Sequence, residues 1–474
     1  MIVRRASLSI VASLSLSAVG AGLAPPATAQ TATAPFHLSD SVSPLLVINP
    51  LPSRPVNSAP PQAPSHTKVR VPEVDPALQR LLTQAQEAMD KKDYPTAIKS
   101  YSDYLAQKPD DAGIHFQLGY AYTAARDPEN AAKEYRRATE LDPKMLPAFV
   151  NLGLALLDQK PAEAIAPLRQ AVALAPDASR PKVLLGVAFE KTGDAAAALE
   201  QLRAARHLDS SNIDIQLELA RVLLQAQRYD EAEKEFRAAL TLRPDSGIAH
   251  YGLAECLVQQ KKNEEAAAEL ATYLQSSPKD AIARIKRAGI LTDLGKNDEA
   301  LAELDRAATV RPETPETLKL RSLIDFRLKN YDASLAALQK LEAAAPNDID
   351  LHARIGHVLL EKKDYPGAVK ELVIAFRADP KQNDVLHDLL AAEYLGGNYT
   401  AALTLLDEVA KRESLSINSW YVRAYCYDKL GQKQEALDTY RKFLDLNNGK
   451  TSDEYFVSAE RVRILERDLK EKKK

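Results

Sequence analysis

A spacing of 34 residues recurs along most of this 474-residue chain. It is clearest in a series of mostly proline residues: Pro109, Pro143, Pro176, Ser210, Pro244, Pro278, Pro312, Pro346, Pro380, Ser414 and Asn448. Each step is 34 residues long, except that the step from Pro143 to Pro176 is 33. Small residues follow the same spacing: Ala97, Ala131, Ala164, Ala198, Ala232, Ala266, Ala300, Ser334, Ala368, Ala402 and Ala436. Such a period predicts stacked copies of one small unit, because each copy buries its apolar face against its neighbours.

The unit that starts at Ala112 shows what is repeated. Ala112 is repeat position 1, and the same positions are used below for every unit. Apolar or small residues stand at positions 7, 8, 11, 20, 24 and 27, namely Leu118, Gly119, Tyr122, Ala131, Tyr135 and Ala138. This spacing predicts two amphipathic helices. The small residues let the helix backbones approach, the large ones fill the space between them, and Pro143 at position 32 ends the second helix.

The period and these signature residues resemble the tetratricopeptide repeat (TPR). The resemblance implies an all-α fold, a right-handed superhelical solenoid of about eleven helix-turn-helix repeats. We therefore expect a signal peptide over 1–29, a proline-rich linker over 30–76, the solenoid over 77–449 and a C-terminal capping helix over 450–474. The one-residue deletion falls beside Pro161, in the turn between the third unit's helices, where a change of length is well tolerated.

Local signals refine the expected repeats. Four glycines at position 15 predict a positive φ where the first helix ends: Gly193, Gly295, Gly397 and Gly431. Asp93 and Asp364 each stand two residues before a proline, which predicts a capped start of the second helix. The eighth unit is the least regular, with Ser322, Asp325 and Ser334 at normally packed positions. We expect a loosened or re-registered helix there, arising from sequence drift or serving as a hinge.

The end of the chain predicts one more helix. Thr451 and Glu454 have the spacing of a capping box. An apolar stripe is expected to cover the last repeat, formed by Phe456, Ala459, Val462, Leu465 and Leu469. The rest of this segment is charged, as the solvent-facing side of a solenoid end requires.

The first residues read as an export signal. Arg4 and Arg5 precede an apolar run, and Ala27-Thr28-Ala29 has the pattern of a cleavage site. We expect export and cleavage after Ala29, to a periplasmic, cell-envelope or secreted location; retention of the segment as an anchor is the alternative. In the following linker, Leu45–Ile48 is an apolar island, either a stray patch or a short docking motif for the chain's own groove or for a partner.

The sequence offers no recognisable catalytic constellation. Cys256 and Cys426 both occupy position 10, five units apart, which excludes a disulfide between them in a solenoid. His115, His250 and His352 occupy position 4, a packing site, and no metal-ligand spacing is present. We expect no enzyme activity, no metal and no cofactor. Lys plus Arg number 62 and Asp plus Glu 65, so no basic excess points to nucleic acid.

What remains is a surface for a partner. By resemblance to the family, positions 5, 9 and 12 line a concave groove. In the first seven units these positions carry an apolar row: Leu82, Phe116, Tyr120, Val150, Leu154, Val183, Val187, Leu217, Tyr251 and Ile285. A contiguous exposed apolar row marks a partner site. Burial of the row within the superhelix, or under the linker, is the alternative.

We therefore expect a non-catalytic scaffold or adaptor that holds a partner protein or peptide in its groove. The alternative is an assembly or regulatory subunit of an envelope enzyme or secretion complex, for instance in polysaccharide synthesis or export.

Overall fold

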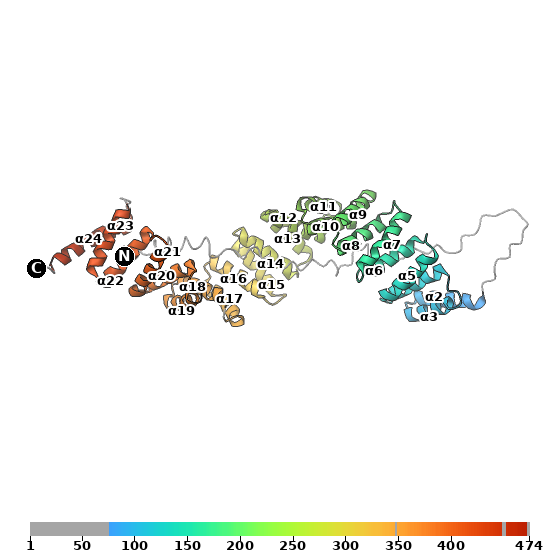
Figure 1. Cartoon of the computed structure of the whole chain (residues 1–474), viewed down its shortest axis with the longest axis horizontal. Coiled ribbons are helices and arrows are strands. Elements are labelled where there is room, and N and C mark those ends of the chain that lie inside the picture. The colour runs from blue at the N-terminus through green and yellow to red at the C-terminus, as the bar shows by residue number, and fades with distance from the viewer. Residues whose placement is uncertain (1–74, 347, 448–451, 472–474) are drawn as a thin grey trace, which may run out of the picture. The chain divides into compact units, whose positions relative to one another are not determined.

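The computed structural model describes residues 75–346, 348–447 and 452–471 (Figure 1). The expected signal peptide and nearly all of the expected linker, including Leu45–Ile48, lie outside these residues. All regular structure in the described ranges is helical. The chain divides into two compact units between Ser277 and Pro278, and each is considered by itself.

Eleven helix pairs follow one another in the described residues, as the repeat predicts. The first helices of the pairs are α2 (Pro76–Asp90), α4 (Ala112–Ala124), α6 (Leu146–Leu156), α8 (Ser179–Lys191), α10 (Ile213–Gln225), α12 (Gly247–Gln259), α14 (Ala281–Asp293), α16 (Pro315–Arg327), α18 (Ile349–Lys362), α20 (Asn383–Gly396) and α22 (Ile417–Lys429). The second helices are α3 (Tyr94–Leu105), α5 (Pro128–Leu141), α7 (Pro161–Leu174), α9 (Ala195–Leu208), α11 (Tyr229–Leu242), α13 (Asn263–Ser276), α15 (Asn297–Ala308), α17 (Tyr331–Ala344), α19 (Tyr365–Ala378), α21 (Tyr399–Arg412) and α23 (Lys433–Asn447). A last helix, α24 (Asp453–Glu471), follows them.

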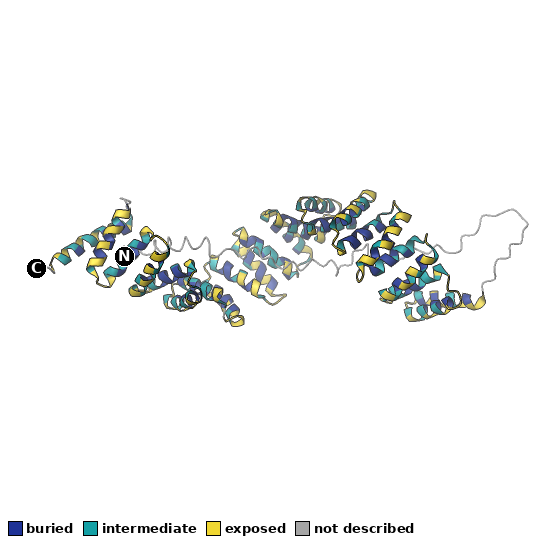
Figure 2. Ribbon diagram, in the orientation of Figure 1, coloured by how far each residue is buried: buried dark blue, intermediate teal, exposed yellow. Residues whose placement is uncertain are grey.

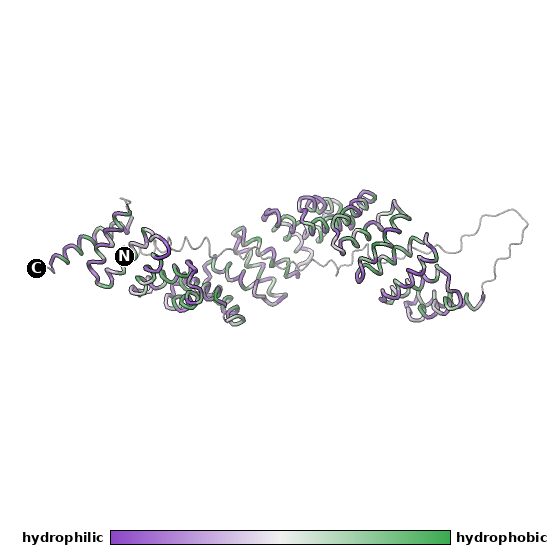
Figure 3. Tube along the Cα trace, viewed as in Figure 1, coloured by the Kyte–Doolittle hydropathy of each residue, from purple (hydrophilic) through white to green (hydrophobic). Residues whose placement is uncertain are grey.

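The expected register is confirmed where the two helices of a unit meet. Ala131 and Ala138 are fully buried in α5, and Tyr135 between them is 1% exposed. Gly119 on α4 faces Tyr135 so closely that a Cβ atom there would lie 2.8 Å from the ring. Each helix therefore carries buried residues on one side and exposed residues on the other (Figure 2). Apolar and polar residues alternate along the helices in the same way (Figure 3).

Left-handed backbone at position 15 closes the turn between the helices. The four predicted glycines have φ between 71° and 84°. Six further units place a lysine, an arginine or a glutamine there with φ between 58° and 69°. The third unit, one residue shorter, has no positive φ among its described residues, so its deletion removes the left-handed residue itself.

The predicted caps are present. Asp93 accepts a hydrogen bond from the backbone N–H of Thr96 at 3.3 Å, and Asp364 accepts one from Gly367 at 3.1 Å. In both helices a proline occupies the first turn, where its missing N–H costs nothing.

The prediction of a loosened eighth unit is wrong. Helices α16 and α17 have their normal lengths, because the polar residues satisfy one another. The Ser334 hydroxyl donates to the Ser322 carbonyl at 2.8 Å, and the Asn330 amide nitrogen lies 3.5 Å from the Asp325 carboxylate. Burial raises the pKa of the Asp325 carboxyl. The unit keeps its register because these hydrogen bonds add to the apolar packing of buried residues such as Leu318 and Leu338.

The expected stripe of α24 needs one correction. Leu465 is buried, and Val462 and Leu469 pack against the last repeat, as predicted. Phe456, by contrast, is 60% exposed. Phe456 and Leu465 are nine positions apart, and at about 100° per residue this places the two on opposite sides of the helix. Thr451 lies outside the described residues, while the Ser452 hydroxyl accepts the Tyr455 N–H at 3.3 Å.

Cys256 and Cys426 are free and buried, as the repeat geometry requires. Burial raises the pKa of each thiol to about 12. Among the described helices, none combines the length and the apolar character needed to cross a membrane.

Candidate partner-binding site

The ten residues of the predicted apolar row are not an exposed face. Val150, Val183, Val187, Leu217 and Tyr251 are buried. The other five are half-buried: Leu82, Phe116, Tyr120, Leu154 and Ile285. Nine members belong to the unit that ends at Ser277, and Ile285 belongs to the other. The row thus contributes to packing, and its role in binding a partner stays a prediction.

Phe116 and Tyr120 are the aromatic members of the row on α4. The Phe116 ring lies 5.7 Å from the Tyr135 ring, centroid to centroid, so part of it packs inside its own unit. Burial raises the pKa of the Tyr120 phenol. Both rings keep some contact with solvent, and they lie one turn apart on the same helix.

A cavity of about 220 Å³ lies in the unit that begins at Pro278. Its lining includes expected groove positions of the eighth and ninth repeats: Leu323 and His357 at position 9, Phe326 at position 12 and Ala353 at position 5. The tenth repeat contributes Asp384, Val385 and Asp388, at positions 2, 3 and 6. Small-molecule sites span roughly 300–1,000 Å³. This smaller cavity, lined by three successive first helices and by α17, has room for about one side chain.

His357 and Asp388 form the polar centre of this cavity. Nδ1 of His357 on α18 lies 2.7 Å from Oδ2 of Asp388 on α20, and an ionised carboxylate only accepts, so Nδ1–H donates. Nε2 of His357 is buried and has no hydrogen-bond partner among the described residues. The imidazole also packs on Phe326, with ring centroids 5.2 Å apart.

The charge of Asp388 controls the titration of His357. Burial alone lowers the pKa of this imidazole, but the hydrogen bond and the negative charge of Asp388 outweigh burial. Glu361 and Asp384 act in the same direction, and the net result is a raised pKa.

Negative charge prevails around the cavity. Three carboxylates line it, on Asp350, Asp384 and Asp388, against the Arg354 guanidinium and the imidazole. With Asp388 engaged by His357, the two remaining carboxylates still outnumber the one arginine. The wall therefore favours a group that carries positive charge or donates hydrogen bonds.

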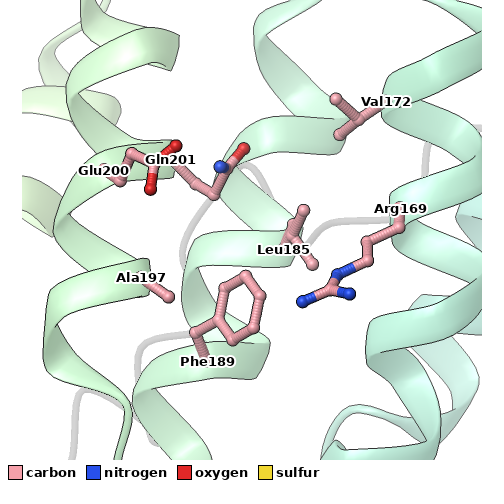
Figure 4. A pocket seen from close by; sticks show the side chains of 7 residues that line it. All are labelled: Arg169, Val172, Leu185, Phe189, Ala197, Glu200 and Gln201. Carbon is pink, nitrogen blue, oxygen red and sulfur yellow. The ribbon is translucent and has the colours of Figure 1, made fainter.

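A second cavity, of about 310 Å³, lies between α7, α8 and α9 (Figure 4). The Arg169 guanidinium carbon lies 5.5 Å from the centroid of the Phe189 ring, toward which the side chain extends. Leu185 and Phe189 contribute positions 7 and 11 of their helix, which are packing positions. This cavity lies off the expected groove stripe.

The position-4 histidines join the two helices of their own repeats. In each of three units, Nδ1 of the histidine bonds a glutamate 19 residues later, at position 23: His115–Glu134 at 2.6 Å, His250–Glu269 at 2.6 Å and His352–Glu371 at 2.8 Å. Gln216 and Arg284 make the same link to Glu235 and Glu303. Nε2 of His115 and of His250 also reaches the carbonyl of the proline six residues earlier, at 2.9 Å. The expected packing role is confirmed, and the recurring glutamate 19 residues away is the sequence signal that would have revealed these pairs.

Comparison with known proteins agrees with this geometry. Sequence models of the tetratricopeptide repeat match residues 82–145, 150–213, 217–281, 286–349 and 354–414, as well as 190–240 and 417–450.

One curated relative is human Protein O-mannosyl-transferase TMTC3, 26% identical over 177 residues. The aligned stretch is 34% of this chain and only 19% of that protein.

Among solved structures, pilF of Pseudomonas aeruginosa is 22% identical, with a TM-score of 0.38, and the match covers 44% of this chain and 96% of that one. A tetratricopeptide repeat protein from Parabacteroides merdae is 16% identical, with a TM-score of 0.40, and the match covers 52% of this chain and 98% of that one. The family models span most of the described residues, and the chain belongs to the tetratricopeptide repeat family.

Proposed function

We propose that this protein is a non-catalytic scaffold that binds an extended segment of a partner protein along positions 5, 9 and 12 of its first helices. Its repeat architecture is that of a protein-interaction scaffold, which supports the general role. The observation that carries the site is the cavity around His357, where three successive first helices converge.

The cavity walls suggest which partner residue binds. A lysine or arginine side chain matches both the excess of carboxylates and the size of the space. Above the raised pKa of His357 the imidazole is neutral and donates Nδ1–H to Asp388, so that Nε2 is an acceptor for an N–H of that side chain. The half-buried aromatic pair Phe116 and Tyr120 supplies an apolar contact in the other unit.

The N-terminal segment supports a location for this activity outside the cytoplasm. Arg4, Arg5 and the following apolar run form the pattern of an export signal, and Ala27-Thr28-Ala29 forms that of a cleavage site. We place the scaffold in the cell envelope or the surrounding medium, where its partner would be an exported or envelope protein.

An array of short peptides, probed with the full-length chain, tests the side-chain preference. We expect bound peptides to share a lysine or an arginine. Replacing Asp350 and Asp384 by asparagine should weaken their binding about tenfold or more, because charge pairs at interfaces contribute about 1.5 kcal/mol or more. Asp350 is exposed and Asp384 half-buried, so both substitutions leave the packed core intact.

The matched control is Asp298→Asn, an exposed carboxylate on α15 that does not line the cavity. It should leave binding unchanged. Binding that shows no preference for basic peptides, or that the double variant does not alter, would contradict this assignment.

A further inference from the structure

Three metal-ligating side chains meet where the eighth and ninth repeats join. They are Glu342 on α17, His352 on α18 and Glu371 on α19. Their ligand atoms all lie within 4.8 Å of one another. Nδ1 of His352 is 2.8 Å from Oε2 of Glu371 and 3.7 Å from Oε1 of Glu342.

The contacts of His352 differ from those of the equivalent histidines in other repeats. His115 and His250 hold the same repeat position and the same glutamate partner. In those units the second ring nitrogen bonds a proline carbonyl. His352 forms no such bond to a described residue; instead, a second carboxylate approaches the nitrogen that Glu371 already contacts. In the second and sixth repeats, the histidine contacts the preceding repeat through a proline carbonyl. In the ninth repeat, Glu342 makes the contact with the preceding repeat instead.

The distances suit a small divalent metal. Bond lengths of about 2.0–2.1 Å to nitrogen and oxygen place tetrahedral ligands about 3.3 Å apart. The two distances from Nδ1 bracket that value, so modest side-chain movements bring all three atoms onto one centre. A mixed nitrogen and carboxylate set suits Zn²⁺, whereas Ca²⁺ and Mg²⁺ prefer oxygen ligands alone.

A metal ion from solvent can reach the three side chains. The side chains of His352 and Glu371 are 13% and 11% exposed, and that of Glu342 is 34% exposed, which provides an entry path from solvent. Lys370 lies 3.3 Å from Oε1 of Glu371, the oxygen that does not face His352, and its own side chain is 77% exposed. This ammonium group can turn to water when a cation binds.

We propose that Glu342, His352 and Glu371 form a Zn²⁺ site that joins the second helix of the eighth repeat to both helices of the ninth. Three protein ligands leave a fourth position for water or for a ligand from a bound partner. Zinc binding displaces any proton on Nδ1 and fixes α17 against α18 and α19. None of these three side chains lines the cavity around His357, and the site does not depend on the peptide-binding proposal.

Isothermal titration of ZnCl₂ into the metal-stripped full-length chain, with no affinity tag, tests the site. We expect one zinc ion per chain and a thermal unfolding temperature that rises with zinc concentration. His352→Gln and Glu342→Gln should each weaken binding about tenfold or more, because even the outer-shell partners of zinc ligands contribute 10–100-fold. His352→Gln preserves the fold, since Gln216 occupies this repeat position in the fifth unit and bonds its glutamate at 2.7 Å.

His250→Gln is the matched control. It removes a histidine from the same repeat position and the same kind of glutamate pair, and it should leave zinc binding unchanged. CaCl₂ and MgCl₂ should produce no comparable heat. The proposal is overturned by absence of zinc binding at millimolar concentration, or by binding that His352→Gln leaves unchanged.

Discussion

Nη1 of Arg284 lies 2.6 Å from Oε2 of Glu303, and the pair joins the two helices of the seventh repeat. The carboxylate is nearly inaccessible, with 3% of its side chain exposed. Arg287 and Arg306 reach its other oxygen at 2.7 Å and 3.0 Å. Arg284 also donates to the Pro278 carbonyl, at 2.7 Å from Nη2. One buried carboxylate thus organises three guanidinium groups around the start of the second compact unit.

Replacement of Glu303 by alanine should destabilise the seventh repeat by about 3–5 kcal/mol, because it leaves buried arginine charge without its partner. The change is measured by urea unfolding, with hydrogen exchange to locate it. Glu299→Ala is the control, since that side chain is 56% exposed and lies 3.9 Å from Arg287. Equal effects of the two substitutions would show that the buried network adds no stability.

Ala131→Leu should overpack the contact between α4 and α5, at a cost of about 1–3 kcal/mol. Ala131 is fully buried, and Tyr135 one turn later already fills the space against Gly119. Solenoid stability arises mainly between neighbours, so faster hydrogen exchange should centre on the second repeat and those beside it. Unchanged protection in α4 and α5 would contradict the packing described here.

The repeat made most of the fold predictable. Positions 8, 20, 24 and 27 encode which surfaces of the two helices meet, and the glycines at position 15 encode the turn. Lysine, arginine and glutamine at position 15 gave no such signal, although Lys92 and Arg126 adopt the same left-handed backbone. The unit's closed geometry imposes that conformation against the residue's own preference.

The candidate cavity was not predictable in the same way. His357 and Asp388 are 31 residues apart and pair only because successive first helices stack side by side. The apolar row was recognised from hydrophobicity alone, which cannot distinguish a groove from packing within or between repeats. Tyr251 illustrates the limit: it is buried, with its ring 5.2 Å from the Tyr273 ring.

His357→Gln should destabilise the protein more at pH 6 than at pH 9. The pKa of His357 is raised in the folded chain, above an unfolded value of about 6.5. Protonation therefore favours the fold; this contribution is complete below the unfolded pKa and is lost as pH rises through the folded pKa. Urea unfolding of both proteins at the two pH values measures the difference. In an Asp388→Asn background the pH-dependent gap should largely disappear, and a gap that grows toward pH 9 would contradict the assigned pair.

If the protein is exported and cleaved as proposed, its mature chain begins at Gln30. Mass spectrometry of the native protein from envelope and medium fractions should find this N-terminus, because cleavage is expected after Ala29. Replacing Ala27 and Ala29 by bulky residues should block processing while leaving the repeats folded. A native protein that retains Met1 or the apolar run would contradict cleavage.

Photo-crosslinking in cells tests the central claim, that partners bind along the first-helix stripe. A benzophenone amino acid replaces Tyr120 or Lys319, which occupy positions 9 and 5, or replaces Lys133 or Lys340 on second helices as controls. The side chains of Lys133 and Lys340 are 60% and 64% exposed, so a crosslinker at either position can reach a protein bound to the second helices. We predict a discrete partner adduct from Tyr120 and Lys319 and little from the controls. Adducts that form equally from all four positions, or only from Lys133 and Lys340, would contradict binding along positions 5, 9 and 12 of the first helices.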